Sequence, residues 1–557
     1  MKTNPTLSSK FNVRSSGFKV PLPGTSIFHP PSSIVLLLLF LAATSSALAT
    51  VRYVNVNNAN PTPPYTNWVT AATNIQDAVD AAVAGDEIVV TNGIYAGASR
   101  LDPHFAYTCV VVDKPLVLNS VNGPDVTIIN GGGAVRCLYL TNNTVMVGFT
   151  LTNGFTYGNG GGVYCEATSA VLSNCVLTGN STPGINSSGG GAYGGTLNNC
   201  TLTGNSANSG GGAENSTLSN CTLTGNVAFG SGNPGGGGPS PGFGGGACDS
   251  TLNNCTLTGN SAGGPYPGGG GSCGGGAGDC TLNNCVLTGN TAYDGSGGGA
   301  YGGTLNNCTL TGNSAINGSG LTTWGGGAML STLNNCIVYF NTAVNGANYY
   351  QDQYGGGVLN YCCTTPLPPN GVGNITSAPL FVNYAGGNLR LQSNSPCINS
   401  GNNAYVVGST DLDGNPRIVG GTVDIGAYEY QTPASIISYA WLQQYGLPTD
   451  GSADFTDSDG DGMNNWQEWI AGTNPTNALS VLKMLAPAAT NNPLGLVVSW
   501  QSVSNITYFL QRSTNLGAQP AFFTIQSNIV GQAGTTSYRD TNAVGSGPFF
   551  YRVGVGN

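Results

Sequence analysis

Residues 189–205 read Gly-Gly-Gly-Ala-Tyr-Gly-Gly-Thr-Leu-Asn-Asn-Cys-Thr-Leu-Thr-Gly-Asn, and related units recur along the middle of the chain. The shortest interval between two units, from Cys200 to Cys221, is 21 residues. One such interval is long enough for a coil of three short strands, and repeats of this length are typical of solenoids. The cysteine of the Leu-x-Asn-Cys core lies at Cys175, Cys200, Cys221, Cys255, Cys285, Cys308 and Cys336. The repeat therefore predicts an all-β solenoid.

The residues of the unit have separate structural roles. Cys200 and Leu202 share one face of a strand and Thr201 the other, so Cys and Leu are expected to stack inside the solenoid. The alternation breaks at Asn198-Asn199, where we expect a bend, because Asn tolerates the left-handed region. Phe149 takes the cysteine position in an earlier, weaker unit. An Asn that closes every unit can bond the coils above and below it, and these closing residues are Asn180, Asn205, Asn226, Asn260, Asn290, Asn313 and Asn341.

The composition indicates a folded protein with few charged residues. The chain has 88 Gly among 557 residues, 40% hydrophobic residues and only 7% charged residues. Disordered chains usually carry more charge and less apolar content. The formal net charge is −10, and so few basic residues argue against nucleic acid or anionic lipid as a partner.

The N-terminus resembles a secretory signal peptide, which we assign to residues 1–49. Basic residues precede the apolar run 34–43, and Ala47-Leu48-Ala49 follows as a cleavage site. A retained membrane anchor is the alternative, but a span needs about 20 apolar residues and this run is about half that length. No later segment is apolar enough to span a membrane.

Residues 50–375 are expected to form the solenoid, which begins with a capping helix. Thr73 and Gln76 fit a capping box as N-cap and third helical residue. An apolar stripe runs from Ile75 to Val83, and Gly85 stops the helix. Such a helix would cover the open edge of the stacked sheets.

The repeats resemble those of the bacterial polymorphic outer-membrane protein family. Residues 298–301, Gly-Gly-Ala-Tyr, match its Gly-Gly-Ala-apolar element, and residues 310–313, Leu-Thr-Gly-Asn, match its Phe-x-x-Asn element, with Leu310 in place of Phe. The resemblance covers about residues 145–345. It implies a right-handed parallel β-helix of the pectin-lyase type, exposed at the cell surface.

Residues 376–431 resemble the choice-of-anchor Q segment found at the end of secreted bacterial β-helix proteins. This resemblance implies a secreted solenoid whose tail varies between relatives. Arg417 is expected to form a structural ion pair with Asp424 or Glu429. The matching stretches are residues 379–381, 395–399, 411–417 and 423–429.

Residues 438–477 contain a calcium-loop motif. Residues 457–468 fit the 12-residue loop in which oxygen ligands converge on one hard cation, Ca²⁺. The expected ligands are Asp457, Asp459, Asp461, the Met463 carbonyl, Asn465 and a bidentate Glu468, with Gly462 at the sharp turn. The alternative is an acidic surface turn. The loop resembles those of dockerins, but it occurs once where dockerins have two, so a cohesin partner is not expected.

Residues 478–557 contain strand patterns separated by turns. Residues 496–500 and 549–553 are the clearest strands. We expect a small β-sandwich of the fibronectin type.

The 16 cysteines would normally indicate disulfides in an exported protein. Equivalent Cβ atoms in stacked coils lie about 4.8 Å apart, beyond the range of about 3.5–4.5 Å that disulfides prefer. We therefore expect buried thiols within the repeats. Pairing is expected outside them, for example of Cys362 or Cys363 with Cys397.

Signals for enzymatic activity are few. His104 is the only histidine after the signal peptide, and residues 150–350 contain no Lys or Arg, so a lyase base is missing there. Asp249 and Asp279 occupy equivalent repeat positions and could lie close together, but a solvated pair is the stronger expectation.

Tyr164, Tyr193 and Tyr301 follow the Gly runs and could form a surface strip that stacks on sugars; ordinary packing is the alternative. The first hypothesis is a non-catalytic secreted or cell-surface protein, adhesive, structural or carbohydrate-binding, with one calcium site. Its partners would be extracellular polysaccharide or cell-surface components. The alternative is a polysaccharide lyase or glycoside hydrolase on the same fold.

Overall fold

The computed structural model describes residues 49–556, apart from residues 98, 231–240, 264–270, 319, 321, 352–355, 487–494 and 545–546. The expected signal peptide lies outside the described residues. Within the described part, no helix is long and apolar enough to cross a membrane.

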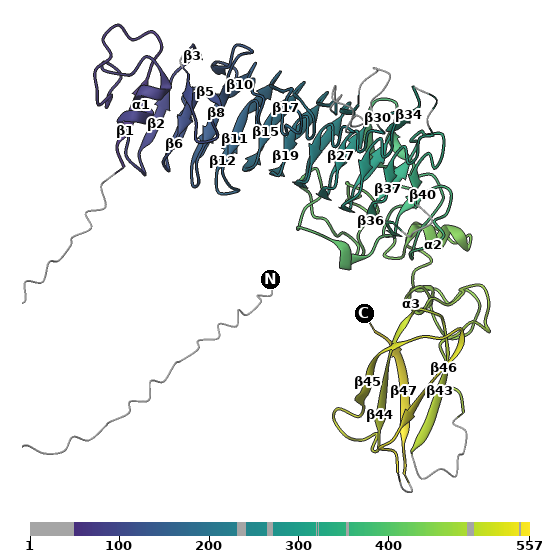
Figure 1. Ribbon diagram of the computed structural model, residues 1–557. Helices are drawn as coiled ribbons and strands as arrows, with labels where there is room; N and C mark the ends of the chain where they lie inside the picture. Colours follow the sequence, from purple (N-terminus) through teal and green to yellow (C-terminus); the bar gives the residue numbers. More distant parts are fainter. Residues whose placement is uncertain are drawn as a thin grey trace, which may run out of the picture. The chain divides into compact units, whose positions relative to one another are not determined.

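The repeats form a right-handed parallel β-helix, whose coils follow one another from purple to green in Figure 1. The coils contribute strands to three long sheets, and the strands pair in parallel with their immediate neighbours, except that β4 and β5 of sheet C pair antiparallel. Sheet A contains β1 (Val51–Val54), β2 (Glu87–Val90), β6 (Val117–Ser120), β9 (Val145–Val147), β12 (Val171–Ser173), β16 (Thr196–Asn198), β20 (Thr217–Ser219), β24 (Thr251–Asn253), β28 (Thr281–Asn283), β32 (Thr304–Asn306), β36 (Thr332–Asn334) and β39 (Leu359–Asn360). Sheet B contains β3 (Gly93–Ala96), β7 (Thr127–Asn130), β10 (Thr150–Thr152), β13 (Val176–Thr178), β17 (Thr201–Thr203), β21 (Thr222–Thr224), β25 (Thr256–Thr258), β29 (Val286–Thr288), β33 (Thr309–Thr311), β37 (Ile337–Tyr339) and β40 (Cys363–Thr364). Sheet C contains β4 (Arg100–Leu101), β5 (Tyr107–Val112), β8 (Arg136–Leu140), β11 (Val163–Cys165), β15 (Ala192–Tyr193), β19 (Ala213–Glu214), β23 (Ala247–Cys248), β27 (Ala277–Gly278), β31 (Ala300–Tyr301), β35 (Ala328–Met329) and β38 (Tyr349–Tyr350).

A fourth, shorter sheet was not expected from the sequence. Sheet D follows the closing asparagines, and its strands are so short that they carry no readable alternation. Its members are β14 (Ser181–Thr182), β18 (Ser206–Ala207), β22 (Val227–Ala228), β26 (Ser261–Ala262), β30 (Thr291–Tyr293) and β34 (Ser314–Ile316). Several of the variable insertions follow this sheet.

The core consists of identical residues stacked coil on coil. Leu197 of sheet A pairs in register with Leu218, and Leu202 of sheet B pairs with Leu223. All four side chains are fully buried. Full burial of one such side chain contributes about 1.5–3 kcal/mol, so each coil adds a similar increment to the core.

The bend between sheets A and B has the predicted left-handed residue. Asn199 has a φ of +52°, and its equivalents in neighbouring coils have the same conformation. The cysteine after the bend is buried, and all 16 cysteines are free thiols. The expected thiols of the repeats are therefore present, but the expected disulfide of Cys362 or Cys363 with Cys397 is not formed.

The closing asparagines form the predicted ladder. Asn260 Nδ2 donates to Asn290 Oδ1 at 2.9 Å and to the Leu223 carbonyl at 2.9 Å. Asn260 Oδ1 accepts from both Nδ2 and the backbone N–H of Asn226. Each amide therefore joins three successive coils.

The N-terminal helix is present, but its cap was assigned one residue too early. Helix α1 spans Ile75–Ala81, and Asn74, rather than Thr73, is the N-cap, accepting from the Asp77 N–H. Asn74 already has an acceptor side chain and an extended backbone, which is what an N-cap requires. Val83 lies beyond the helix and is exposed.

Residues 376–431 add no further parallel coil. They contain the antiparallel pair β41 (Phe381–Asn383) and β42 (Asn388–Leu391) and the 3₁₀ helix η1 (Asn403–Tyr405). Their apolar side chains, such as Ile398 and Ile425, form a second core with Val286 and Ile337 on the outer face of sheet B. This segment therefore covers one side of the last coils.

The expected Arg417 ion pair is wrong in detail. Arg417 is fully buried, and its Nη2 donates to the carbonyls of Asp424 and Gly426. The Asp424 carboxylate accepts backbone N–H groups instead. The role is structural, as expected, but no direct pair with Asp424 or Glu429 forms among the described residues.

The C-terminal part has two short helices and two antiparallel sheets. Its elements are α2 (Tyr439–Gln444), α3 (Asn465–Ala471), β43 (Leu496–Ser502), β44 (Thr507–Ser513), β45 (Phe523–Val530), β46 (Gly534–Asp540) and β47 (Phe550–Val555). Strand β43 pairs with β46, and β44 lies between β45 and β47. Trp500 and Tyr508 are buried between the two sheets. The described part thus has five strands, fewer than the seven of a fibronectin-like sandwich.

Candidate functional site

Three tyrosines form a stack on the outer face of sheet C. Tyr139, Tyr164 and Tyr193 are register partners in β8, β11 and β15. The Tyr164 ring lies 6.1 Å from the Tyr139 ring and 5.2 Å from the Tyr193 ring, with interplanar angles of 11° and 24°. The structure therefore brings two of the three predicted tyrosines, Tyr164 and Tyr193, into contact.

Tyr301 lies in the same column, but four strands further along sheet C. At about 4.8 Å per strand this is roughly 19 Å from Tyr193. Its ring contacts Phe243, with centroids 6.3 Å apart in an edge arrangement. Tyr301 is therefore not part of the tyrosine stack.

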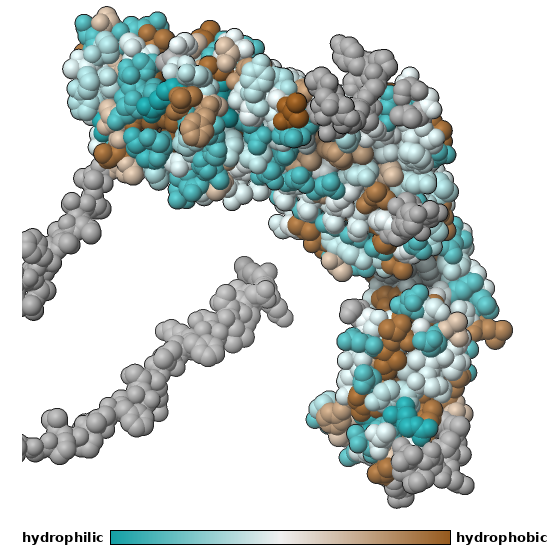
Figure 2. All heavy atoms as spheres, in the orientation of Figure 1, coloured by the Kyte–Doolittle hydropathy of each residue, from teal (hydrophilic) through white to brown (hydrophobic). Residues whose placement is uncertain are grey.

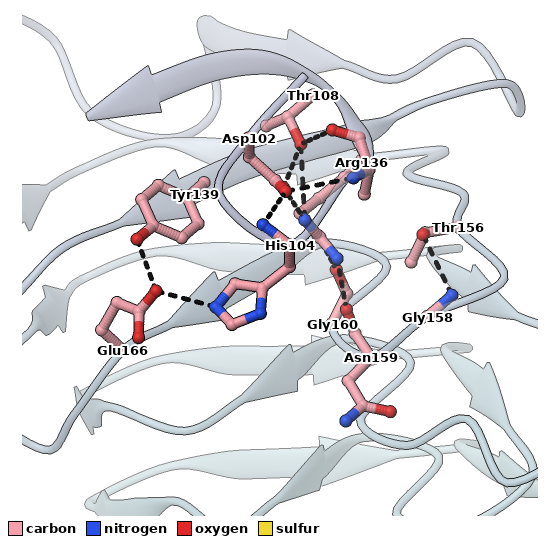
Figure 3. A network of polar contacts seen from close by, with 11 residues as sticks. Asp102, His104, Thr108, Arg136, Tyr139, Thr156, Gly158, Asn159, Gly160 and Glu166 are labelled. Atoms are coloured by element: carbon pink, nitrogen blue, oxygen red, sulfur yellow. Dashed lines mark hydrogen bonds and ion pairs between the residues drawn. The ribbon is translucent and has the colours of Figure 1, made fainter. Parts of the chain in front are cut away.

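His104 lies beside the stack, with its ring near those of Tyr164 and Tyr139, and Figure 3 shows it next to Tyr139 and Glu166. The loop between β4 and β5 carries this residue, and its ring lies 4.2 Å from the Tyr164 ring. His104 Nε2 lies 2.8 Å from Glu166 Oε1, and Tyr139 donates its hydroxyl to the same oxygen at 2.5 Å. A histidine, a carboxylate and two phenol rings thus meet at one place.

A buried ion pair supports the loop that carries His104. Arg136 is 1% exposed, and its Nη1 contacts the Asp102 carboxylate. Its other nitrogens donate to the carbonyls of Gly160 and Asn159 (Figure 3). Asp102 Oδ1 in turn accepts the His104 N–H at 2.8 Å. Desolvation by burial lowers the pKa of Arg136 to about 10, which still leaves it charged at neutral pH.

The electrostatics of the cluster favour an ionised Glu166 and a protonated Tyr139. Burial alone would raise the pKa of Glu166, but hydrogen bonds from Tyr139 and His104 outweigh this effect and lower it. Burial and the neighbouring Glu166 raise the pKa of Tyr139. Tyr139 is only 3% exposed and its hydroxyl is bound to Glu166, so the accessible groups of the cluster are His104, Glu166 and the partly exposed rings of Tyr164 and Tyr193. Aromatic rings and fixed polar groups of this kind suit sugar C–H faces and hydroxyls.

Among the described residues, the surface of the cluster carries no Lys or Arg side chain. The sequence has no Lys or Arg between Arg136 and Arg390, and Arg136 is fully engaged beneath the surface. Abstraction of a proton beside a carboxylate needs a base together with a charge that stabilises the product anion. The described groups do not supply this pair.

Sequence reasoning missed His104, Glu166 and Tyr139 as neighbours. His104 and Glu166 lie 62 residues apart in the chain and belong to no common motif. The only available signal was that His104 is the single histidine after residue 49. Asp249 and Asp279 do occupy equivalent places in neighbouring coils, and both are exposed. Partial burial, followed by the charge of Asp249, raises the pKa of Asp279.

The predicted calcium ligands converge in the loop before α3. Ligand atoms of Asp457, Asp459 and Asp461 lie within 4.8 Å of one another. Glu468 is fully buried on α3, whose N-cap is Asn464. Its carboxylate lies close enough to the acidic loop to feel the charges of the three aspartates.

Several oxygens in this loop are buried without a partner among the described residues. They are Asp459 Oδ2, Asp461 Oδ2, Asn465 Oδ1 and Glu468 Oε2. Burial, and next the charges of Asp459 and Asp461, raise the pKa of Glu468 to about 7. Unpaired buried oxygens and mutually repelling carboxylates suit a divalent cation. The oxygen donors present therefore fit Ca²⁺.

The two remaining predicted ligands, Met463 and Asn465, are each held by a hydrogen bond. Met463 was expected to contribute only its carbonyl, and its N–H donates to Asp461 Oδ1 at 2.8 Å, which keeps it in the loop. Asn465 Nδ2 donates to the Ala453 carbonyl at 2.8 Å, so its amide group is tied to the stem of the loop.

Comparisons with known proteins address the fold. No family model matches the sequence, and no curated protein matches it. Among solved structures, pectate lyase Pel9A is similar with a TM-score of 0.40 and 15% identity, over 68% of this chain and 96% of that chain. A rhamnogalacturonan lyase is similar with a TM-score of 0.27 and 12% identity, over 72% of this chain and 100% of that chain. Tailspike protein 2 of an Escherichia coli O157:H7 bacteriophage is similar with a TM-score of 0.26 and 11% identity, over 89% of this chain and 65% of that chain.

Proposed function

We propose that this protein is a non-catalytic, extracellular glycan-binding β-helix. The observation that carries the proposal is the parallel stack of Tyr139, Tyr164 and Tyr193 with the His104–Glu166 pair beside it. Rigid aromatic faces bind the apolar faces of ligands at low entropic cost, and the fixed polar pair orients them.

The charge distribution selects neutral glycans. The exposed acids and the absence of Lys and Arg between Arg136 and Arg390 would repel a polyanionic chain. On the face shown in Figure 2, hydrophobic residues are scattered among hydrophilic ones. This surface suits a hydroxyl-rich polymer better than an apolar partner.

The test is binding of the full mature chain to neutral and uronic-acid polysaccharides, with chain cleavage scored in the same samples. We expect binding without cleavage, and a loss of about tenfold in affinity, roughly 1.4 kcal/mol, in the variant Tyr164→Ala/Tyr193→Ala. Tyr157→Ala is the matched control, because Tyr157 is 74% exposed outside the stack. Cleavage of any glycan would support the lyase or hydrolase alternative instead.

We also propose that residues 457–468 bind one Ca²⁺ that stabilises the C-terminal part. The unpaired buried oxygens of Asp459, Asp461 and Glu468 support this proposal. A ligand at 100 times its Kd adds about 2.7 kcal/mol to the free energy of unfolding.

The calcium proposal is tested by thermal unfolding with Ca²⁺ and with a chelator. We expect Ca²⁺ to raise the Tm of the wild type, and the variant Asp457→Ala/Glu468→Ala to lose this response. Asp450→Ala is the control, because Asp450 lies on the surface just before the loop. A response that persists in the double variant would remove the loop assignment.

A further inference from the structure

The bend between sheets A and B carries a second column of asparagines. Every member has the same left-handed conformation, with φ between +51° and +53°. Equivalent backbone geometry gives each side chain an equivalent direction. The members are Asn174, Asn199, Asn220, Asn254, Asn284, Asn307 and Asn335.

A later part of the chain already binds three of these seven asparagines. Residues 402–410 run back along the coils, and their carbonyls accept from successive asparagines. Asn335 donates to Asn402 at 2.9 Å, and Asn307 donates to Tyr405 at 3.1 Å. Asn284 donates to both Val407 and Thr410 at 3.2 Å. These three asparagines are buried, and the column thus binds this segment, which includes the 3₁₀ helix η1, by one amide per coil.

Residues 402–410 leave the column at the point where the neighbouring outer surface of sheet B changes from buried to accessible side chains. Beside the covered asparagines, sheet B presents Val286, Thr309 and Ile337, all buried. In the two preceding coils the same positions are Thr256 and Thr222, which remain accessible. A polypeptide with apolar side chains gains burial only over the first set.

A cleft of about 650 Å³ opens where the segment departs. Its lining is mainly polar and includes Asn220, Asn254, Thr222, Thr256, Asp413 and Tyr428. Arg390 holds the wall in place, because it forms two bonds to the Asp413 carboxylate, at 2.5 and 2.6 Å. Its guanidinium also lies 5.0 Å from the centre of the Tyr428 ring.

We propose that this cleft is a second binding site, for a short stretch of neutral saccharide. It lies outside the tyrosine stack of sheet C and does not depend on it. The amides of Asn220 and Asn254 repeat the geometry that binds carbonyls two coils further on. The hydroxyls of Thr222 and Thr256, together with the Asp413 carboxylate, line this site. They stand where a bound peptide would need apolar side chains such as Val286 and Ile337. Its volume lies within the usual range of ligand sites, about 300–1,000 Å³.

The test uses the full mature chain with Tyr164→Ala/Tyr193→Ala, so that the sheet C stack no longer contributes. Binding of cellohexaose, xylohexaose, mannohexaose and laminarihexaose is measured by calorimetry and by saturation-transfer NMR. A synthetic peptide with the sequence of residues 402–412 serves as the competing ligand class.

The diagnostic variant adds Asn220→Asp/Asn254→Asp. Asp tolerates the left-handed conformation as Asn does, but it lacks the N–H donors. Asn143→Asp is the matched control, because Asn143 is an exposed residue with a φ of +59° outside the column. Equal Tm values of the two variants show that folding is intact.

We expect at least one hexasaccharide to bind saturably, with affinity reduced at least about tenfold by the Asn220/Asn254 changes and unchanged by Asn143→Asp. Absence of hexasaccharide binding, or binding that ignores these changes, would overturn the inference. Preference for the peptide would also overturn it, in favour of a peptide groove. Failure of the sheet C proposal is seen separately, as equal glycan binding by the wild type and the tyrosine variant.

Discussion

At the scale of the residue, the cysteine of each coil has a polar role as well as an apolar one. The Cys221 N–H donates to Cys255 Sγ at 3.4 Å, and the same contact recurs in neighbouring coils. Each thiol also lies 3.3 Å from the carbonyl two residues before it, as Cys255 does with Asn253. The sulfur therefore pairs a backbone N–H that would otherwise be buried alone.

This role predicts a specific cost for Cys255→Ala. The substitution leaves the Cys221 N–H buried without an acceptor, so the free energy of unfolding should fall by about 1–3 kcal/mol, with a further loss from the cavity. Urea denaturation measures the change. Cys273→Ala is the control, because Cys273 is partly exposed outside the ladder. Equal effects of both substitutions would show that the sulfur acceptor contributes nothing.

At the scale of the element, the closing turns are joined by amide groups rather than by charges. Gly191 permits this packing, because an added Cβ would lie only 3.1 Å from the Asn205 side chain. The Gly runs and the Asn ladder are thus parts of one arrangement. The repeat unit keeps both because neither fits without the other.

The ladder predicts that Asn260→Asp is strongly destabilising at neutral pH. The new carboxylate would lose both donor bonds and face the Leu223 carbonyl and Asn290 Oδ1. An unpaired buried charge costs roughly 3–5 kcal/mol, and protonation at low pH should restore part of the loss. Thermal unfolding at pH 4 and pH 7 measures this, with the exposed Asn143→Asp as control. A Tm drop as small as that of the control would contradict the ladder's role.

Helices and strands also show where local signals compete. The acidic loop could be located from sequence because the spacing of its carboxylates is local. The cap of α1 was misplaced because Thr73 and Asn74 are both competent caps, and only the packing of Ile75 selects between them. Sheet D was missed because its strands are too short to show a pattern.

At the scale of the whole molecule, two buried carboxyl groups within residues 376–431 make the free energy of unfolding depend on pH. Burial, followed by the charge of Asp424, raises the pKa of Glu429 to about 9. Burial also raises the pKa of Asp424 to about 7. Both groups bind protons more tightly in the folded state than in the unfolded chain.

The stabilisation from these protons is therefore complete below the unfolded pKa values, near pH 4, and is lost as pH rises through about 7 and 9. We expect the Tm in chelator-containing buffer to fall between pH 5 and pH 9, and Glu429→Gln to reduce the slope. Differential scanning calorimetry measures both. A Tm that rises over this range would contradict the assignment.

The repeat unit alone was sufficient to predict an all-β solenoid with buried thiols, a left-handed bend and an Asn ladder, whereas the right-handed parallel β-helix was what the family resemblance implied. These features depend on residues at fixed offsets, which recur in every coil and are readable wherever the unit is. The acidic loop occurs only once, but it could also be recognised because its carboxylates lie at fixed offsets in the sequence.

The outer surface could not be derived in this way, because its contacts depend on coil register and on loops that fold back. His104 meets Glu166 and Tyr164 only because the Arg136–Asp102 pair holds a loop over sheet C. Tyr301 shares their column but lies four strands away. The path of residues 402–410 likewise depends on hydrogen bonds from Asn284, Asn307 and Asn335, which lie 67 to 126 residues away in the chain and which no local pattern encodes.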